Sequence, residues 1–218
     1  MLDRLVWIDC EMTGLDLSRD ALVEVAVVIT DSELALLDDG LDLVIATTEE
    51  ALDGMPDVVR EMHTSSGLLE EIKVATLSMA DAEEQLLDYI RQFVPDAGKA
   101  PLCGNSVATD RAFLARDMPK LESHMHYRMI DVSSIKELAR RWYPRVYYNA
   151  PAKAGGHRAL ADIKESIDEL RYYRATVLVQ PPGPDAERAT AIAASISGTP
   201  PPAPAKNDDG SGAVPASH

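Results

Sequence analysis

Four acidic residues and one histidine in this chain have types and spacings that suit metal-ion chemistry. They are Asp9, Glu11, Asp110, His157 and Asp162. Hydrolysis of a phosphodiester near neutral pH needs a site that neutralises negative charge and a group that deprotonates water. Four carboxylates can hold two divalent ions about 3.5–4 Å apart, which stabilises both the attacking and the leaving oxygen. The set therefore meets the first need, and the histidine meets the second.

Asp9 and Glu11 are the strongest part of this pattern, because they follow the apolar segment LVWI. At the end of a strand, residues two apart point to the same face. Two buried like charges are unfavourable unless a cation joins them. Mg²⁺ and Mn²⁺ are divalent ions that favour carboxylate oxygens. The pair therefore predicts a metal site at the end of a buried strand.

The other three residues have ordinary explanations when each is taken alone. Asp110 stands at the start of a predicted helix, where an acidic side chain complements the helix dipole. Asp162 lies within a predicted helix and could belong to its solvated face. His157 follows two glycines and could simply be exposed. Near a metal site, however, a histidine suits the role of general base, because histidines titrate close to neutral pH.

Hydrophobic periodicity predicts the elements that would position these residues. Strands are expected at 5–9, 21–31, 34–45, 100–103 and 127–130. Helices are expected over most of 47–72, from Ser78 onward, and at 109–118, 132–143 and 158–176, with a loop at 147–156. Three early strands followed by alternating helices and strands predict an α/β fold, with a mixed sheet flanked by helices.

The composition changes near the C-terminus. Residues 1–180 are expected to form one domain, and 181–198 a short C-terminal helix. The segment 199–218 is rich in Pro, Ala, Gly and Ser and has almost no large apolar residue. Such a segment does not bury enough surface to offset its conformational entropy. We therefore predict that 199–218 is disordered.

The composition also limits the partners of the protein. The chain carries a net charge of −15 and shows no basic stripe, whereas proteins that track along nucleic acid neutralise its phosphates with basic side chains. This disfavours a long nucleic acid but not a very short one. Cys10 and Cys103 lack the spacing of a disulfide framework or a ligand set, and no stretch reaches membrane-spanning length. We expect a soluble cytoplasmic protein with no membrane partner.

Four segments carry a resemblance to a known family: DCEMTGLD, GNSVATDRAFL, YRMIDVSSIKELARRWYP and HRALADI. Over roughly residues 3–178 the chain resembles the DEDDh exonucleases of the ribonuclease H-like superfamily, and among them the oligoribonucleases. The resemblance implies a ribonuclease H-like mixed sheet and a metal-dependent 3′-to-5′ exoribonuclease. Such an enzyme would degrade short oligoribonucleotides, down to dinucleotides, to nucleoside 5′-monophosphates.

The resemblance also implies roles for residues at matching positions. The metal ligands would be Asp9, Glu11, Asp110 and Asp162, for two divalent cations, Mg²⁺ or Mn²⁺, and the general base would be His157. The substrate-binding residues would be Leu15, His63, Ser106, Tyr127, Arg128 and Ser133. Leu15 would wedge against the terminal bases. Tyr127 would reach the active site of the opposite subunit, which implies a functional homodimer.

Within that set, Ser106, Arg128 and Ser133 would form a cap over the 5′ phosphate. An arginine is a bidentate donor suited to phosphate, and serine hydroxyls can complete the cap. A closed 5′ side would limit substrates to very short single-stranded RNA, especially 5′-phosphorylated dinucleotides. From the residues alone, Arg128 could equally form a surface ion pair, and Tyr127 could be a core residue of an edge strand.

The chain departs from the family pattern at Val58, where many relatives carry a tryptophan that stacks on a base. Valine has no aromatic face, and stacking is worth roughly 1–3 kcal/mol per base. Either the bases are held more weakly in this protein, or a neighbouring residue replaces the contact.

Two other functions remain open from the sequence. A DEDDh exonuclease that trims single-stranded DNA or longer RNA, such as a proofreading subunit, would have an open or basic channel. A catalytically silent nucleotide-binding module would tolerate the loss of a carboxylate or of His157, yet all five residues are present.

Overall fold

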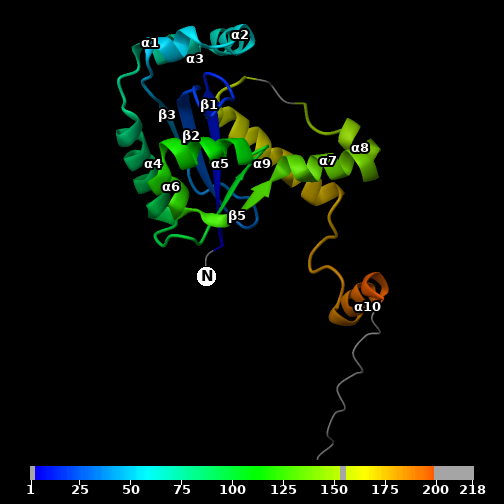
Figure 1. The fold of residues 1–218 in the computed structure, drawn as a ribbon. Helices are drawn as coiled ribbons and strands as arrows, with labels where there is room; N and C mark the ends of the chain where they lie inside the picture. Colours follow the sequence, from blue (N-terminus) through cyan, green and yellow to red (C-terminus); the bar gives the residue numbers. More distant parts are fainter. Residues whose placement is uncertain (1–2, 153–155, 199–218) are drawn as a thin grey trace, which may run out of the picture. The chain divides into compact units, whose positions relative to one another are not determined.

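A five-stranded sheet lies at the centre of the computed structural model, which describes residues 3–152 and 156–198. The strands are β1 (Arg4–Met12), β2 (Leu22–Asp31), β3 (Leu41–Val44), β4 (Pro101–Gly104) and β5 (His126–Asp131). They follow the order β3-β2-β1-β4-β5 (Figure 1). β1 pairs antiparallel with β2 and parallel with β4. The sheet is therefore mixed, and helices flank it, which confirms the predicted fold class.

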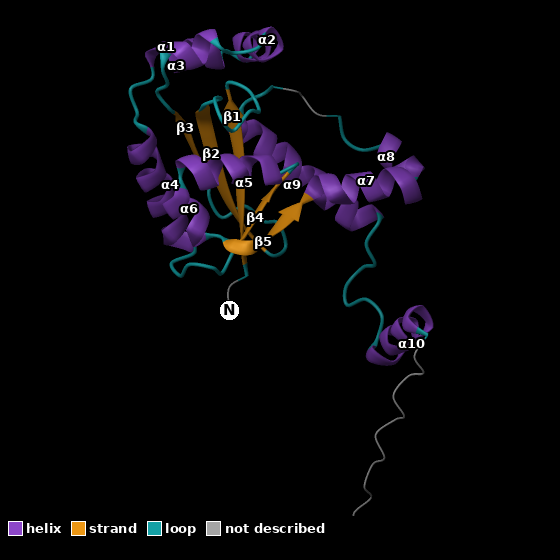
Figure 2. Cartoon of the chain, viewed as in Figure 1, coloured by secondary structure: helices purple, strands orange, loops and turns teal. Residues whose placement is uncertain are grey.

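Helices flank both faces of this sheet, and the first three helices of the chain lie beyond one end of its strands (Figure 2). The helices are α1 (Glu49–Asp53), α2 (Asp57–Ser65), α3 (Leu68–Val74), α4 (Met79–Phe93), α5 (Ala108–Asp117), α6 (Pro119–His124), α7 (Val132–Trp142), α8 (Pro144–Tyr148) and α9 (Ala159–Thr176). Contacts within the chain separate two units, Met1–Leu178 and Val179–His218. The second unit contains α10 (Ala186–Ser197). The predicted disordered segment, 199–218, lies outside the described residues.

Alternation along β1 divides the core into two layers. Val6 and Ile8 pack in a cluster with residues of α4, α5 and α6, whereas Trp7 packs with residues of α7 and α9. Successive side chains of a strand point to opposite faces, so Asp9 and Glu11 continue the face of Trp7. The two carboxylates therefore lie on the side of the sheet that α9 covers.

Two segments differ from the sequence prediction. The strand expected at 34–45 is reduced to β3, because the Asp31 carboxylate accepts the backbone N–H groups of Glu33 and Ala35, at 2.9 and 2.8 Å, and stabilises a turn. Gly40, with φ 97°, continues the irregular path up to β3. The loop expected at 147–156 begins two residues late, because α8 extends to Tyr148.

Both cysteines are buried free thiols. Among the described helices, none is both long enough and apolar enough to cross a membrane. The cytoplasmic location stays a prediction.

Candidate active site

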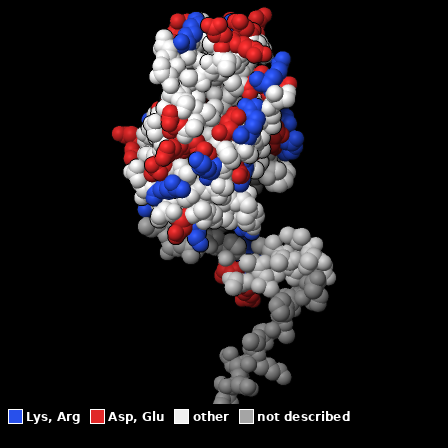
Figure 3. All heavy atoms as spheres, turned by 60° about the vertical axis from the view of Figure 1, so that its left-hand side comes forward, with Lys and Arg blue, Asp and Glu red and all other residues white. Residues whose placement is uncertain are grey.

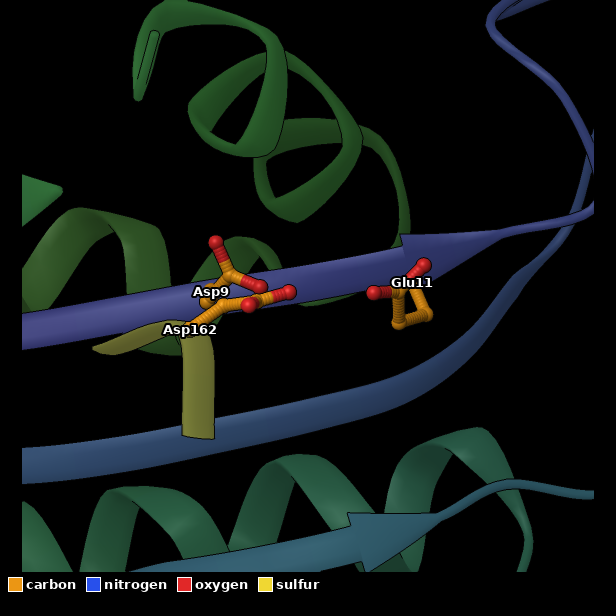
Figure 4. A group of neighbouring side chains, drawn as sticks. All are labelled: Asp9, Glu11 and Asp162. Atoms are coloured by element: carbon orange, nitrogen blue, oxygen red, sulfur yellow. The ribbon is translucent and has the colours of Figure 1, made fainter. Parts of the chain in front are cut away.

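Three of the predicted metal ligands meet between the end of β1 and the start of α9. Asp9, Glu11 and Asp162 each offer a carboxylate oxygen, and these oxygens all lie within 4.8 Å of one another (Figure 4). Asp9 and Glu11 project from β1, and Asp162 projects from the first turn of α9. The period of the strand and the start of the helix thus bring together residues about 150 positions apart in the sequence.

The packing of α9 fixes the position of Asp162. Ala159, Ile163 and Ile167 are buried in the same cluster as Trp7 and Val28 of the sheet. These positions recur at helical spacing, so one face of α9 is held against the sheet. Asp162 therefore stands beside the end of β1.

Asp110, the fourth predicted ligand, approaches the same strand from α5. Its Oδ1 accepts the backbone N–H of Cys10 at 3.0 Å. β1 pairs with β4 only at Val6 and Trp7, so the carboxylate takes the place of a strand partner beyond that point. Burial raises the pKa of Asp110 to about 6.

The carboxylates repel one another strongly. Burial raises the pKa of Asp9 to about 9, and the charge of Asp110 is the largest of the neighbouring charges that raise it further. Burial raises the pKa of Glu11 to about 8, with the charges of Glu24 and Asp162 adding to the effect. A divalent cation would remove this repulsion, because it favours the ionised form of each ligand. The oxygen-only donor set fits a hard ion such as Mg²⁺ or Mn²⁺.

A buried ion pair, which the sequence analysis missed, lies behind these ligands. Glu24 of β2 stands opposite Glu11 in the strand register and is 0% exposed. The Nε and Nη2 atoms of Arg158 both lie 2.8 Å from its Oε1. The Nη1 atom of Arg158 also bonds Glu71 of α3 at 2.7 Å. The available signal was a single acidic residue within the apolar run LVEVAVVIT.

His157, the predicted general base, immediately precedes Arg158. Its side chain is exposed and its backbone has φ 45°, an uncommon conformation for a residue with a side chain. It forms no hydrogen bond or ion pair with any residue of the described segments. The structure thus puts it at the entrance to α9, without a contact to the carboxylates.

His63 lies in the interior rather than at an open surface. Its side chain is fully buried, and its Nε2 lies 2.9 Å from the Met12 carbonyl oxygen. Its Nδ1 lies 3.9 Å from Glu11 Oε2 and has no hydrogen-bond partner within residues 3–152 and 156–198. The structure therefore places His63 directly behind Glu11.

Two of the three predicted cap residues come together in the structure. The hydroxyl oxygens of Ser106 and Ser133 lie 3.2 Å apart. Asp131 holds both residues, because its Oδ1 accepts the backbone N–H of Ser106 at 3.0 Å and of Ser133 at 2.9 Å. The guanidinium carbon of Arg128 instead lies 5.4 Å from the ring centroid of Tyr127. Both of these side chains are exposed on β5.

Leu15 and Val58 are large apolar side chains left open to solvent, each 74% exposed. Leu15 lies in the turn after β1, where the Asp20 carboxylate accepts the Asp16 N–H at 2.8 Å. A Cβ at Gly14 would lie 2.2 Å from that carboxylate, so any larger residue there would displace Asp20 from the turn. Val58 lies on α2, the helix that also carries His63.

Solved structures share the fold of this chain. The zinc-bound complex of E. coli exonuclease I with single-stranded DNA matches with a TM-score of 0.62 at 13% identity, over 81% of this chain and 41% of that chain. Exonuclease I from Methylocaldum szegediense matches with a TM-score of 0.57 at 20% identity, over 80% of this chain and 41% of that chain. The chain thus spans less than half the length of these proteins, and at these identities the likeness shows the fold alone.

Sequence comparison is more specific. A family model described as an exonuclease matches residues 6–170. An oligoribonuclease from Streptomyces griseus is 65% identical over 197 residues, which cover 90% of this chain and 98% of that protein. An oligoribonuclease from Mycobacterium sp. (strain KMS) is 62% identical over 196 residues, which cover 90% of this chain and 91% of that protein. The chain therefore belongs to the exonuclease family and, within it, to the oligoribonucleases.

Proposed function

We propose that the protein is a 3′-to-5′ exoribonuclease that degrades short oligoribonucleotides, down to dinucleotides. The observation that carries the proposal is the cluster of Asp9, Glu11 and Asp162, with Asp110 beside it, inside the segment that matches the exonuclease family. Partly or fully buried carboxylates whose charges raise the pKa of Asp9 and Glu11 are unfavourable for folding alone. Their presence is explained if they bind divalent cations.

The four carboxylates would hold two Mg²⁺ or Mn²⁺ ions, which would supply Lewis acidity and neutralise the charge that develops on the phosphate. His157 would take a proton from the attacking water as the water oxygen bonds to phosphorus. The bond between phosphorus and the 3′ oxygen of the preceding nucleotide then breaks, and that oxygen gains a proton. The products are a nucleoside 5′-monophosphate and an RNA shortened by one residue. The exposed position of His157 at the entrance to α9 leaves its ring free for this role.

A preference for short substrates fits the charge distribution of the protein. On the face drawn in Figure 3, acidic and basic side chains are interspersed, without a continuous basic track. A long RNA would need such a track, because phosphate neutralisation dominates its binding. Ser106 and Ser133, with Arg128, would instead cap one 5′ phosphate.

We also propose that the protein is a homodimer. β5 is an edge strand, and exposed apolar side chains gather on it and on α7 and α8. They are Tyr127, Met129, Leu138, Trp142, Tyr143 and Tyr148. A second copy of the chain would cover them, and Tyr127 would then reach the partner's active site. Light scattering of purified protein checks this proposal, since a monomer at micromolar concentration would contradict it.

The decisive experiment measures turnover of 5′-phosphorylated RNAs of two, five and twenty residues with Mg²⁺ or Mn²⁺. The proposal expects nucleoside monophosphates from all short substrates and the highest kcat/KM for the dinucleotide. A rate that is flat or rises with length would favour an exonuclease for longer strands. An intact dinucleotide, with binding retained, would favour a catalytically silent module.

A further inference from the structure

Asn105 links the two halves of the site through its side-chain amide. It directly follows β4, and its Nδ2 donates to Ser166 Oγ at 2.8 Å and to Glu169 Oε2 at 3.1 Å. Its Oδ1 accepts a hydrogen bond from Ser133 Oγ at 2.8 Å. An ionised carboxylate only accepts hydrogen bonds, so Glu169 requires the NH₂ group on its side. Both protons and the oxygen of the amide are therefore committed, and the amide has one orientation.

On one side, Asn105 is joined to the helix that carries Asp162. Ser166 Oγ accepts from Asn105 and donates to the carbonyl oxygen of Asp162 at 2.8 Å. Glu169 also forms an ion pair with Lys136 of α7 at 2.8 Å. Ser166 and Glu169 are both buried. This side of the network is thus packed against the metal-binding end of the site, which consists of Asp9, Glu11, Asp110 and Asp162.

On the other side, Asn105 fixes the direction of hydrogen bonding between the two cap serines. Because Ser133 gives its proton to Asn105, the contact between Ser133 and Ser106 must use the proton of Ser106. Ser106 is exposed, so its hydroxyl can turn away from Ser133 and donate its proton to a phosphate oxygen instead. Its backbone has φ 52°, an uncommon conformation, and the N–H bond to Asp131 stabilises it.

We propose that Asn105 is a positioning residue that holds the cap serines at a fixed distance from the helix of Asp162, and so determines the preference for the shortest RNA. This inference rests on the proposed exoribonuclease function. A fixed distance between the cap and the point of cleavage matches one substrate length. A loosened cap would accept the dinucleotide less well and would change little for a longer RNA, which has other contacts.

The test compares Asn105→Ala with Asn149→Ala, a matched control at the C-terminal cap of α8 whose amide donates to the carbonyl oxygen of Arg145 at 2.8 Å. The measured quantity is kcat/KM for the dinucleotide divided by kcat/KM for the five-residue RNA. In Asn105→Ala we expect this ratio to fall about tenfold, because the lost hydrogen bonds to the cap raise KM for the dinucleotide. The control should keep the ratio of the unmodified protein. An equal fall in kcat for both lengths would overturn the proposal, because it indicates only a structural role.

A double-mutant cycle with Ser133→Ala tests whether Asn105 acts through the cap. We expect the double variant to lower the ratio no further than Ser133→Ala alone, whereas additive effects would overturn the proposal. If Asn105→Ala does not fold, Ser166→Ala is the alternative, because it removes only one hydroxyl. It should lower the ratio of kcat/KM for the dinucleotide to that for the five-residue RNA about threefold, and an unchanged ratio would count against the proposal.

A binding measurement separates this proposal from the proposed function. Titration calorimetry with Ca²⁺, without turnover, compares dinucleotides that have or lack a 5′ phosphate. The proposal expects Asn105→Ala to lose most of the preference for the 5′ phosphate, and a retained preference would overturn it. Absence of cleavage by the unmodified protein with Mg²⁺ or Mn²⁺ would instead count against the exoribonuclease function.

Discussion

The metal-binding end of the site differs from the cap end, which consists of Ser106, Arg128 and Ser133 with Asn105 and Asp131 behind them. The difference lies in how the polar groups of each end are satisfied. Burial, and then the charges of neighbouring carboxylates, raise the pKa of Asp9 and of Glu11. At the cap end, the Asn105 amide donates two hydrogen bonds and accepts one, and the Asp131 carboxylate accepts two backbone N–H groups. The first region is unfavourable until cations bind, whereas Asn105 and Asp131 in the second are already hydrogen-bonded within the protein.

This difference indicates two separate tasks. A site that must bind and release cations benefits from ligands that repel one another when the cations are absent. A site that selects one substrate length benefits from donors fixed in advance, because binding then requires little reordering. The folded chain achieves the first with charges gathered from β1, α5 and α9, and the second with hydrogen bonds that the Asn105 amide and the Asp131 carboxylate form within the protein.

The largest expected effect is on turnover when a ligand carboxylate is lost. Asp9→Asn should lower kcat by about 10³-fold or more, because it removes an oxygen that neutralises metal charge during the reaction. The same substitution should raise the melting temperature of the metal-free protein near neutral pH, because it removes a carboxyl group whose raised pKa opposes folding above about pH 4. Rate assays and thermal unfolding check both results, with Asp88→Asn on α4 as an exposed control. A lower melting temperature would contradict the claim that the carboxylates of the metal-binding end destabilise the metal-free protein.

The second prediction concerns pH and metal removal. In the folded protein the pKa values of Asp9 and Glu11 rise to about 9 and about 8, from ordinary values of 3.8 and 4.5. A raised folded pKa contributes stability that is fully present below the unfolded value and is lost as the pH rises through the folded value. Chelated protein should therefore lose stability between about pH 4 and pH 9.

Adding Mg²⁺ should reverse this loss, most strongly at high pH, because cations favour the ionised carboxylates. Melting curves across the pH range, with Mg²⁺ or with a chelator, measure the effect. Equal curves under both conditions would mean that the carboxylates do not bind the ion. The cap end provides the contrast, since Ser133→Ala should leave the difference between the two conditions unchanged.

Local patterns in the sequence predicted the metal-binding end better than the cap end. The alternation of β1 predicted that Asp9 and Glu11 share a face, whereas the helical pattern placed Asp162 only within a helix, and the family resemblance grouped it with the other two. The bonds of Asn105 to Ser166 and Glu169 span about 60 residues. No local period encodes such contacts, which depend on how α9 packs beside β4.

The strand predicted at 34–45 failed for a related reason. Its apolar residues suit a strand, but the Asp31 carboxylate accepts two backbone N–H groups and stabilises a turn instead. Such side-chain bonds compete with strand pairing and are weak signals in a sequence. Arg158 was overlooked because its role depends on Glu24, which lies 134 residues away.

The third prediction tests how Arg158 supports the metal-binding end. Arg158→Met should lower the free energy of unfolding by about 3 kcal/mol, because it leaves the buried Glu24 without its cationic partner. Glu24→Gln combined with Arg158→Met should recover part of this loss. Chemical denaturation measures each value. A cost below that of a surface ion pair, about 1 kcal/mol, would show that Glu24 is satisfied without the arginine.

Two glutamates of α3, Glu70 and Glu71, form a matched pair of substitutions. They distinguish loss of the bond between α3 and Arg158 from a simple loss of negative charge. Glu71 bonds Arg158 of another element, whereas Glu70 bonds Lys73 of its own helix at 2.6 Å. Both glutamates are solvent-accessible. Glu71→Gln should therefore weaken Mg²⁺ binding by the protein, measured by calorimetry, and Glu70→Gln should not. Equal effects would assign the change to overall charge.

The smallest expected effect concerns Val58, which lies at neither end of the site. Its side chain is 74% exposed on α2, so a larger residue has room. Val58→Trp should lower KM for the dinucleotide by about fivefold, because stacking on one base is worth at least about 1 kcal/mol. Val74→Trp is the matched control, since Val74 is 77% exposed at the end of α3. An unchanged KM in Val58→Trp would mean that another residue already holds the bases. The substrate would then have contacts beyond the cap and the metal-binding end.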